Sequence, residues 1–425
     1  MIDPQANAPR YFRLIAVATI LGAVAALVTF VFVVLVNAGT ALIWQSAALA
    51  TGLPAPAWTI LVCLVGGLLV GVLVRAFGDH TGIFAEVMNE FGRTGRFDYR
   101  NAPGIVLTAL VSLASGASLG PEAPLADATG GIGTWLADRL HGDERETRSL
   151  SYSGVSGMLG AFITSPVGGP LLALESARGG GAMASLYFWM LFPSMLASAT
   201  ATVIFVVLTG SFFGTVYVFP EYLPTFRDLL QAVPLGAIGG AVGVVFFILL
   251  RLLQRFVQPM KNRLVLRGLL GGLALGIAGA AFPLILFSGE EQSVELIERA
   301  AEIGVPMLLA LAGVKLVITC LILVCGWKGG YIFPIMFVGI ALGLAVNLIF
   351  PQIPVAVAVA ATIAGAVAAA FRAPLFAIFF TGILVQREAI PAIAVAAVAG
   401  SLVAAGAALW NARRAPLAAP ADGGA

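Results

Sequence analysis

Long apolar stretches follow one another along nearly the whole chain, and they constrain the fold more than any other feature. They cover residues 12–36, 56–77, 103–119, 150–175, 183–210, 232–250, 268–287, 304–325, 331–350, 353–385 and 389–410. Several approach the roughly 20 residues that an α-helix needs to cross hydrocarbon. Charged residues make up only 10% of the chain, against about 25% in a typical soluble domain. The pattern predicts an all-α polytopic membrane protein with about ten membrane passes.

Glycine and proline are spread through the apolar stretches rather than gathered in linkers. The chain has 50 glycines and 23 prolines, and such residues permit close helix packing and interrupted helices within a bundle. We therefore expect residues 1–425 to form a single membrane domain, with a disordered tail at 413–425. The first apolar stretch is too long for a cleaved signal peptide, and no cleavage site with a polar mature sequence follows it.

Charged residues are distributed unevenly along the chain. Basic residues gather at 10–13, 75–100, 139–148, 251–267 and 413–414, whereas segment 288–303 contains five glutamates and one arginine. Because basic loops tend to stay on the cytoplasmic side of a membrane, we expect both termini and the 251–267 connection there, and the acidic loop 288–303 outside. The formal net charge is only +2, and we expect no nucleic-acid partner.

The three cysteines, Cys63, Cys320 and Cys325, all lie in apolar sequence. Such positions are typical of small buried side chains rather than of disulfides or metal ligands. We therefore expect buried free thiols, no metal site and no cofactor.

A single glutamate stands between two prolines in Gly120-Pro121-Glu122-Ala123-Pro124, with long apolar sequence on both sides. A carboxylate at membrane depth is costly, so Glu122 is expected to face a protein-lined or water-filled space. A helix that begins at Glu122 or Ala123 would direct its free amides and the positive end of its dipole toward that space, which suits an anion. Taken alone, the same residues also fit an interfacial turn with Glu122 as a solvated first-turn acid.

An internal repeat favours the first interpretation. Each half contains a Gly/Pro-interrupted helix start and, at a similar separation, a second proline-led helix, with Pro124 and Pro166 in the first half and Pro334 and Pro374 in the second. Paired interruptions in corresponding positions of two halves indicate an ion or substrate site near the midplane. We take the repeats as residues 10–215 and 228–412, joined by a hinge at 219–227. In the second half, Gly329-Gly330-Tyr331-Ile332-Phe333-Pro334 would turn sharply and expose consecutive amides to an anion.

In this order and spacing, the motifs resemble those of the CLC family of chloride channels and proton-coupled chloride exchangers. Gly120–Pro124 is similar to the family's G-[K/R]-E-G-P signature, Gly330–Pro334 to G-x-F-x-P, and His80–Phe84 to G-S-G-I-P. The resemblance implies an inverted-topology two-fold repeat of tilted, interrupted helices. It also implies a homodimer with one pore per protomer, in a bacterial inner membrane, that transports anions and has no catalytic residue.

The resemblance also implies a set of site residues. Glu122 is expected as the gating carboxylate that competes with the anion for its outer site. The amides of Tyr331 and Ile332 are expected to coordinate the central anion. Gly330 is expected to belong to the same anion-binding turn, and Thr81 to offer its hydroxyl there. Chloride is the expected anion, with fluoride, nitrate and other small monovalent anions left open.

Departures from the family pattern bear on proton coupling. The family's internal proton-relay glutamate falls on Ser176, and Glu175 matches its neighbour, which is not the relay residue. Pro121 replaces a basic residue, and no tyrosine occurs near 415–418, where the family's central tyrosine is expected. Two hypotheses stay open. One is passive or loosely coupled anion transport; the other is proton-coupled exchange of chloride or fluoride by a non-standard route through Glu175 or Ser176.

Two other classes of function fit parts of the sequence. An intramembrane serine hydrolase is suggested by Ser118 in G-x-S-x-G and Ser156 in G-x-S-G, but the only histidines, His80 and His141, lie outside the apolar spans. A carrier of organic solutes would need more polar groups within the spans than Glu122, Asp127, Glu175 and Lys315. We assign no transport role to Asp127 or Lys315.

Overall fold

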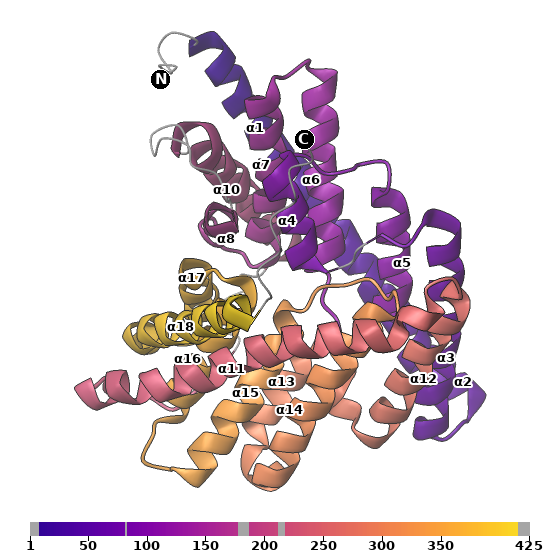
Figure 1. The fold of residues 1–425 in the computed structure, drawn as a ribbon, viewed down its shortest axis with the longest axis vertical. Helices are drawn as coiled ribbons and strands as arrows, with labels where there is room; N and C mark the ends of the chain where they lie inside the picture. Colours follow the sequence, from indigo (N-terminus) through magenta and orange to yellow (C-terminus); the bar gives the residue numbers. More distant parts are fainter. Residues whose placement is uncertain (1–7, 81–82, 177–186, 211–216, 415–425) are drawn as a thin grey trace, which may run out of the picture.

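The computed structural model describes residues 8–80, 83–176, 187–210 and 217–414, which form helices joined by short connections (Figure 1). The first half contains α1 (Ala8–Ala41), α2 (Ala48–Thr51), α3 (Ala55–Phe77), α4 (Phe84–Thr94), α5 (Ala102–Ala114), α6 (Glu122–Arg139), α7 (Glu144–Phe162), α8 (Gly168–Ser176) and α10 (Phe192–Thr209). The second half contains α11 (Phe226–Val257), α12 (Leu264–Ala281), α13 (Glu290–Glu298), α14 (Ala300–Val324), α15 (Ile332–Ile349), α16 (Val355–Phe371), α17 (Pro374–Leu384) and α18 (Ile390–Arg414).

Eight helical segments of the described chain are long and apolar enough to cross a membrane. Three shorter apolar helices, α5, α16 and α17, accompany them. The predicted multi-pass membrane class is therefore confirmed, although the apolar sequence is divided differently from the expected series of about ten passes. Stretch 353–385, for example, forms two helices, and the second begins at the predicted Pro374.

The two long apolar stretches that divide do so in the same way. Between α7 and α8 the backbone of Thr164 has φ 48°, two residues before Pro166, and between α16 and α17 that of Arg372 has φ 53°, two residues before Pro374. In both breaks a left-handed residue follows the end of the helix. Pro374 is the first residue of α17, where a proline loses no hydrogen bond, whereas Pro166 lies in the turn before α8, which begins at Gly168.

Helices α5 and α14 also end alike. Gly116 (φ 86°) follows α5 and Gly326 (φ 94°) follows α14, and in each loop two backbone N–H groups bond back to the last turn of the helix. This capping arrangement requires a left-handed residue and so favours glycine. The order α5, α6, α7, α8 is matched by α14, α15, α16, α17, as expected for a two-fold repeat. In Figure 1 the first-half helices fill most of the upper part and the second-half helices the lower, with α3 beside α12.

Close helix crossings depend on glycine. A Cβ added to Gly154 of α7 would lie 2.1 Å from the carbonyl oxygen of Thr129 in α6, and one added to Gly365 of α16 would lie 2.1 Å from that of Gly236 in α11. No real side chain fits at that distance, so alanine at either position would push the helices apart. The small residues therefore bring backbones together in each half, as predicted from composition.

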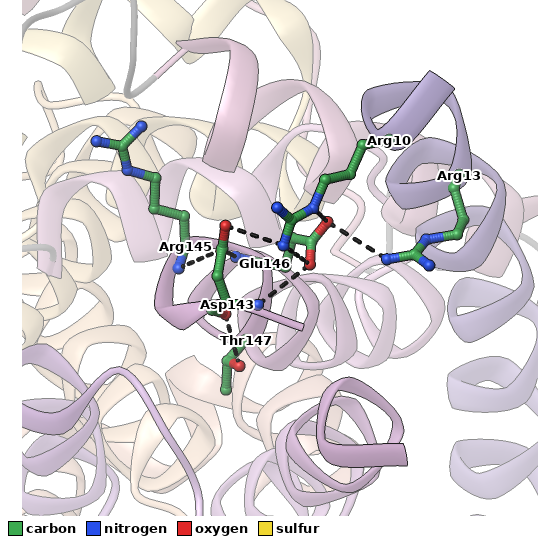
Figure 2. Close-up of polar contacts among 6 residues, drawn as sticks. All are labelled: Arg10, Arg13, Asp143, Arg145, Glu146 and Thr147. Atoms are coloured by element: carbon green, nitrogen blue, oxygen red, sulfur yellow. Dashed lines mark hydrogen bonds and ion pairs between the residues drawn. The ribbon is translucent and has the colours of Figure 1, made fainter. Parts of the chain in front are cut away.

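An ionic cluster fixes the start of α7 against α1 (Figure 2). Asp143 accepts hydrogen bonds from the amides of Arg145 and Glu146, and Glu146 accepts one from the amide of Asp143, which forms a capping box. The buried Glu146 carboxylate also receives both Nε (2.7 Å) and Nη2 (2.9 Å) of Arg10. This bidentate pair holds the two helix ends together.

The structure can be compared with three further predictions from the sequence. Cys63, Cys320 and Cys325 are buried free thiols, as expected. The acidic segment is not a loop, because most of it forms the helix α13 and the start of α14. Helix α18 continues to Arg414, past the predicted start of the tail, and residues 415–425 lie outside the described chain.

Candidate functional site

The two interrupted helices α6 and α15 begin side by side. The amide of Gly120 donates to the carbonyl of Gly330 (2.9 Å), and the amide of Gly330 donates to the carbonyl of Gly120 (2.6 Å). This antiparallel bridge joins the loops that precede the two helices. The predicted helix start at Glu122 is confirmed, and the N-terminus of each helix, where the dipole is positive, lies at the junction.

Glu122 reaches across this junction. Its side chain is fully buried, and its Oε1 accepts a hydrogen bond from the amide of Ile332, the first residue of α15, at 2.6 Å. Its Oε2 has no hydrogen-bond partner among the described residues. A Cβ on Gly330 would lie 2.0 Å from the carboxylate carbon, and one on Gly120 would lie 2.1 Å from Oε2. Both glycines are thus required to make room for the carboxylate.

Tyr331 lies directly before α15 and is buried. Its ring stacks on Phe371, with centroids 4.9 Å apart, and packs against Phe246 at 4.6 Å. Its hydroxyl faces the backbone of Ala85 near the start of α4, but it makes no hydrogen bond of standard geometry within the described chain. Three helix starts, those of α4, α6 and α15, therefore approach one another here. Thr81, the other predicted anion ligand, lies outside the described residues.

A buried lysine packs against α15. Lys315 of α14 donates to the carbonyl oxygens of Ile285 (3.1 Å) and Phe287 (3.0 Å), and its Nζ lies 4.7 Å from the centre of the Phe337 ring. These contacts hold the connection between α12 and α13, and Gly289 packs against the lysine side chain. Sequence reasoning assigned no role to Lys315, because its apolar surroundings alone carry no signal for one.

Glu290 begins α13, outside the eight candidate spans. Burial raises the pKa of its carboxyl to about 7, and the negative charges of Glu291 and Glu122 act in the same direction. Glu290 therefore lies within electrostatic reach of Glu122. It was predicted only as one member of an acidic loop.

The raised pKa makes a prediction for stability. An unfolded glutamate titrates near pH 4.3, so between about pH 4.5 and 7 the folded state binds more protons, and the contribution of Glu290 to stability falls as pH rises through that window. Glu290→Gln should therefore lose less thermal stability than wild type when purified protein is moved from pH 5 to pH 8. Glu298→Gln, at the exposed far end of α13, should behave like wild type. An equal pH-dependent loss in Glu290→Gln would contradict the assignment.

The Glu175 carboxylate caps the N-terminus of α17. Its Oε1 accepts from the amide of Leu375 (2.8 Å) and its Oε2 from that of Phe376 (2.9 Å), both in the first turn of α17. The residue therefore joins α8 to α17, the corresponding helices of the two halves. Ser176 is the last residue of α8.

The serines of the hydrolase motifs do not pair with histidine in the described chain. The hydroxyl of Ser118 bonds to that of Thr319 (3.0 Å), and the hydroxyl of Ser156 is buried with no partner among the described residues. His80 bonds through Nε2 to the carbonyl of Phe77. These contacts supply no general base for a serine nucleophile.

A multi-pass helical bundle with a buried carboxylate held across two internal helix starts is the architecture of a membrane anion transporter. Residues 66–405 match the family model for voltage-gated chloride channels. The chain belongs to this family, the CLC family of anion channels and transporters. This confirms the class of protein and the fold predicted from the motifs.

Several relatives and solved structures are similar to the chain. "Putative ion-transport protein YfeO" of Escherichia coli O139:H28 is 28% identical over 351 residues, which cover 81% of this chain and 80% of YfeO. The crystal structure of a slow cyanobacterial Cl⁻/H⁺ antiporter superposes with a TM-score of 0.81 at 21% identity, covering 94% of this chain and 97% of the antiporter. A CLC-type fluoride/proton antiporter gives a TM-score of 0.77 at 20% identity, covering 92% and 95%.

Proposed function

We propose that the protein transports a small monovalent anion, chloride by the weight of its family, along a path that crosses the junction of α6 and α15, and that Glu122 is the gate. One observation carries the proposal. The Glu122 carboxylate accepts the amide N–H of Ile332 at the start of α15, and a helix N-terminus is a natural place for an anion. A carboxylate bound there occupies the place that a transported anion would need.

The gate works by competition between two anions. When Glu122 is charged, it holds the Ile332 amide through a charge-assisted hydrogen bond. Protonation removes the charge, weakens that bond and frees the amide. A transported anion then exchanges its water for N–H groups without meeting a full countercharge, which allows it to leave as well as to bind. Anion flux should therefore increase as pH falls.

The residues at the start of α15 contribute to anion binding in different ways. The amide of Gly330 is already bonded to Gly120, so Gly330 contributes room for the carboxylate rather than an N–H ligand. Ile332 contributes its amide. Tyr331 contributes its amide, as the resemblance implies, and its hydroxyl, which makes no hydrogen bond of standard geometry in the described chain. We propose this hydroxyl as the donor in place of the family's central tyrosine, and Thr81 remains a proposed hydroxyl ligand.

Removing the hydroxyl of Tyr331 should therefore impair transport more than folding. In Tyr331→Phe we expect about a three- to tenfold lower chloride flux, as for the loss of one hydrogen bond of about 1 kcal/mol. Thermal stability should change little, because the hydroxyl makes no hydrogen bond of standard geometry in the described chain. Tyr152→Phe is the matched control, because the buried Tyr152 hydroxyl bonds to the carbonyl of Pro170 at 2.7 Å. It should lose stability and keep the chloride flux per folded protein. Equal flux in Tyr331→Phe and wild type would remove the hydroxyl from the path.

Proton-coupled exchange of chloride or fluoride is the second candidate function. Its support is the fold shared with a Cl⁻/H⁺ antiporter and a fluoride/proton antiporter. Flux of chloride, fluoride and nitrate into liposomes, recorded together with proton movement, distinguishes the two candidates and tests the choice of anion. No flux of any of these anions would contradict both.

The remaining parts of the proposal concern the setting of the protein. We place it in a bacterial inner membrane as a homodimer with both termini cytoplasmic, and as a transporter rather than an enzyme, without cofactor or metal. The basic segment 251–267 supports this orientation, although it is not a single connection as predicted, because it forms the end of α11, a short turn and the start of α12. Modification of single introduced cysteines at each end of the chain in intact and permeabilised cells tests the orientation.

A further inference from the structure

A basic pocket of about 550 Å³ opens where the connection between α3 and α4 meets the end of α11 and the start of α12. Its lining includes five cationic side chains, those of Arg251, Arg255, Lys261, Arg267 and Lys328. The acidic lining residues are Asp79 and Glu86. A pocket of this size is in the range that holds organic ligands, and its excess of positive charge favours an anion.

Arg267 provides an independent sign of a missing ligand. The residue is only 8% exposed, and its Nη2 pairs with Oδ2 of Asp79 at 2.5 Å. Its Nε is buried and has no hydrogen-bond partner among the described residues. Buried guanidinium N–H groups almost always find an acceptor. The Arg267 guanidinium, which lines the pocket, therefore keeps an N–H group without an acceptor among the described residues.

The pocket adjoins the proposed anion path. Lys328, which is buried, donates through Nζ to the carbonyl of His80. Lys328 directly precedes Gly329 and Gly330, and His80 directly precedes Thr81. The same lysine thus belongs to the pocket and ties together the two segments that carry the proposed anion ligands.

We propose that this pocket binds a multivalent phosphate-bearing anion, and that the bound anion slows transport by occupying one mouth of the path. The pocket is far larger than a halide requires. Arginine forks match phosphate oxygens in pairs, and three arginines line the pocket. The effect on transport rests on the proposed function, whereas binding does not.

Direct binding is the first test. Sodium pyrophosphate is titrated calorimetrically into the full-length protein in neutral detergent at fixed ionic strength. We expect saturable binding, about tenfold weaker in Arg255→Gln because one charge-assisted contact is lost. The control is Arg227→Gln, an exposed arginine at the other end of α11, which should bind like wild type. Arg267→Gln should abolish binding, but it also breaks the ion pair with Asp79. If Arg267→Gln fails to fold, the result with Arg255→Gln decides the test.

Chloride flux in liposomes is the second measurement. Pyrophosphate should lower wild-type flux from one side of the membrane only, and less so in Arg255→Gln. Absence of saturable binding to wild type, or equal weakening by Arg255→Gln and Arg227→Gln, would overturn the site. Binding without any anion flux would keep the site and contradict the proposed function. The lipid composition identifies the source of the phosphate. If pyrophosphate binds to the protein in neutral lipid but not in phosphatidylglycerol, the lipid headgroup occupies the pocket; if it binds in both lipids, the natural ligand is a soluble phosphate compound.

Discussion

Glu122→Gln should show fast anion flux that hardly changes with pH. The amide side chain has the size of the protonated acid but no charge, so it competes weakly for the Ile332 amide. A hydrogen bond to a charged group contributes about 1–1.5 kcal/mol more than a neutral one, so flux at pH 7.5 should rise roughly tenfold over wild type. Wild-type flux should approach the same level only in acid. Chloride efflux from liposomes, measured from pH 4.5 to 8, checks this expectation.

The matched control for this prediction is Glu90→Gln. Glu90 is an exposed acid on α4, so its neutralisation changes the net charge of the protein by the same amount and leaves the junction of α6 and α15 intact. The control should keep the wild-type pH profile. If Glu122→Gln also keeps that profile, Glu122 is not the gate.

Wild-type protein should couple little or no proton movement to an anion gradient. Ser176 stands where the family resemblance places the internal relay carboxylate, and serine does not carry a proton as a carboxylate does. The neighbouring Glu175 uses both oxygens to cap α17, so a proton on it would break one of two hydrogen bonds. Proton uptake driven by a chloride gradient in liposomes should therefore stay near the leak rate.

Glu175→Gln separates the capping role from a proton role. Glutamine offers one acceptor oxygen, so one amide of the α17 first turn loses its partner, at a cost of about 1–3 kcal/mol of folding stability. We expect a lower melting temperature with an unchanged ratio of protons to anions. Robust proton uptake in wild type that disappears in a folded Glu175→Gln would instead establish the non-standard proton route.

The fold and the two helix starts at the junction were predictable because their signals are local. Apolar length predicted the membrane class, and each helix start at the junction follows from prolines and glycines in its own segment. The proline-led start at Pro374 was likewise visible, and Pro166 marked the position of the other break, although α8 begins two residues after it, at Gly168. Even the pairing of the two halves was indicated, because the same motif occurs twice.

The missed features depend on contacts between distant residues. Ile332 and Glu122 are separated by 210 positions, so the sequence suggested a common site but not that the carboxylate itself holds the amide. Nothing local indicates that the Gly330 amide is taken by Gly120, or that Glu175 caps a helix of the other half. The basic pocket combines residues from helix ends and connections that are far apart in the sequence. From the sequence alone, its arginines indicate only membrane orientation.

The most direct test of the central claim is to locate an anion at the start of α15. Crystals of Glu122→Gln grown in bromide would show the anion by its anomalous scattering. We expect bromide within hydrogen-bond distance of the Ile332 amide, with the substituted glutamine side chain turned away or displaced. A structure in which bromide is absent from that amide, and lies on a path that avoids the junction of α6 and α15, would contradict it.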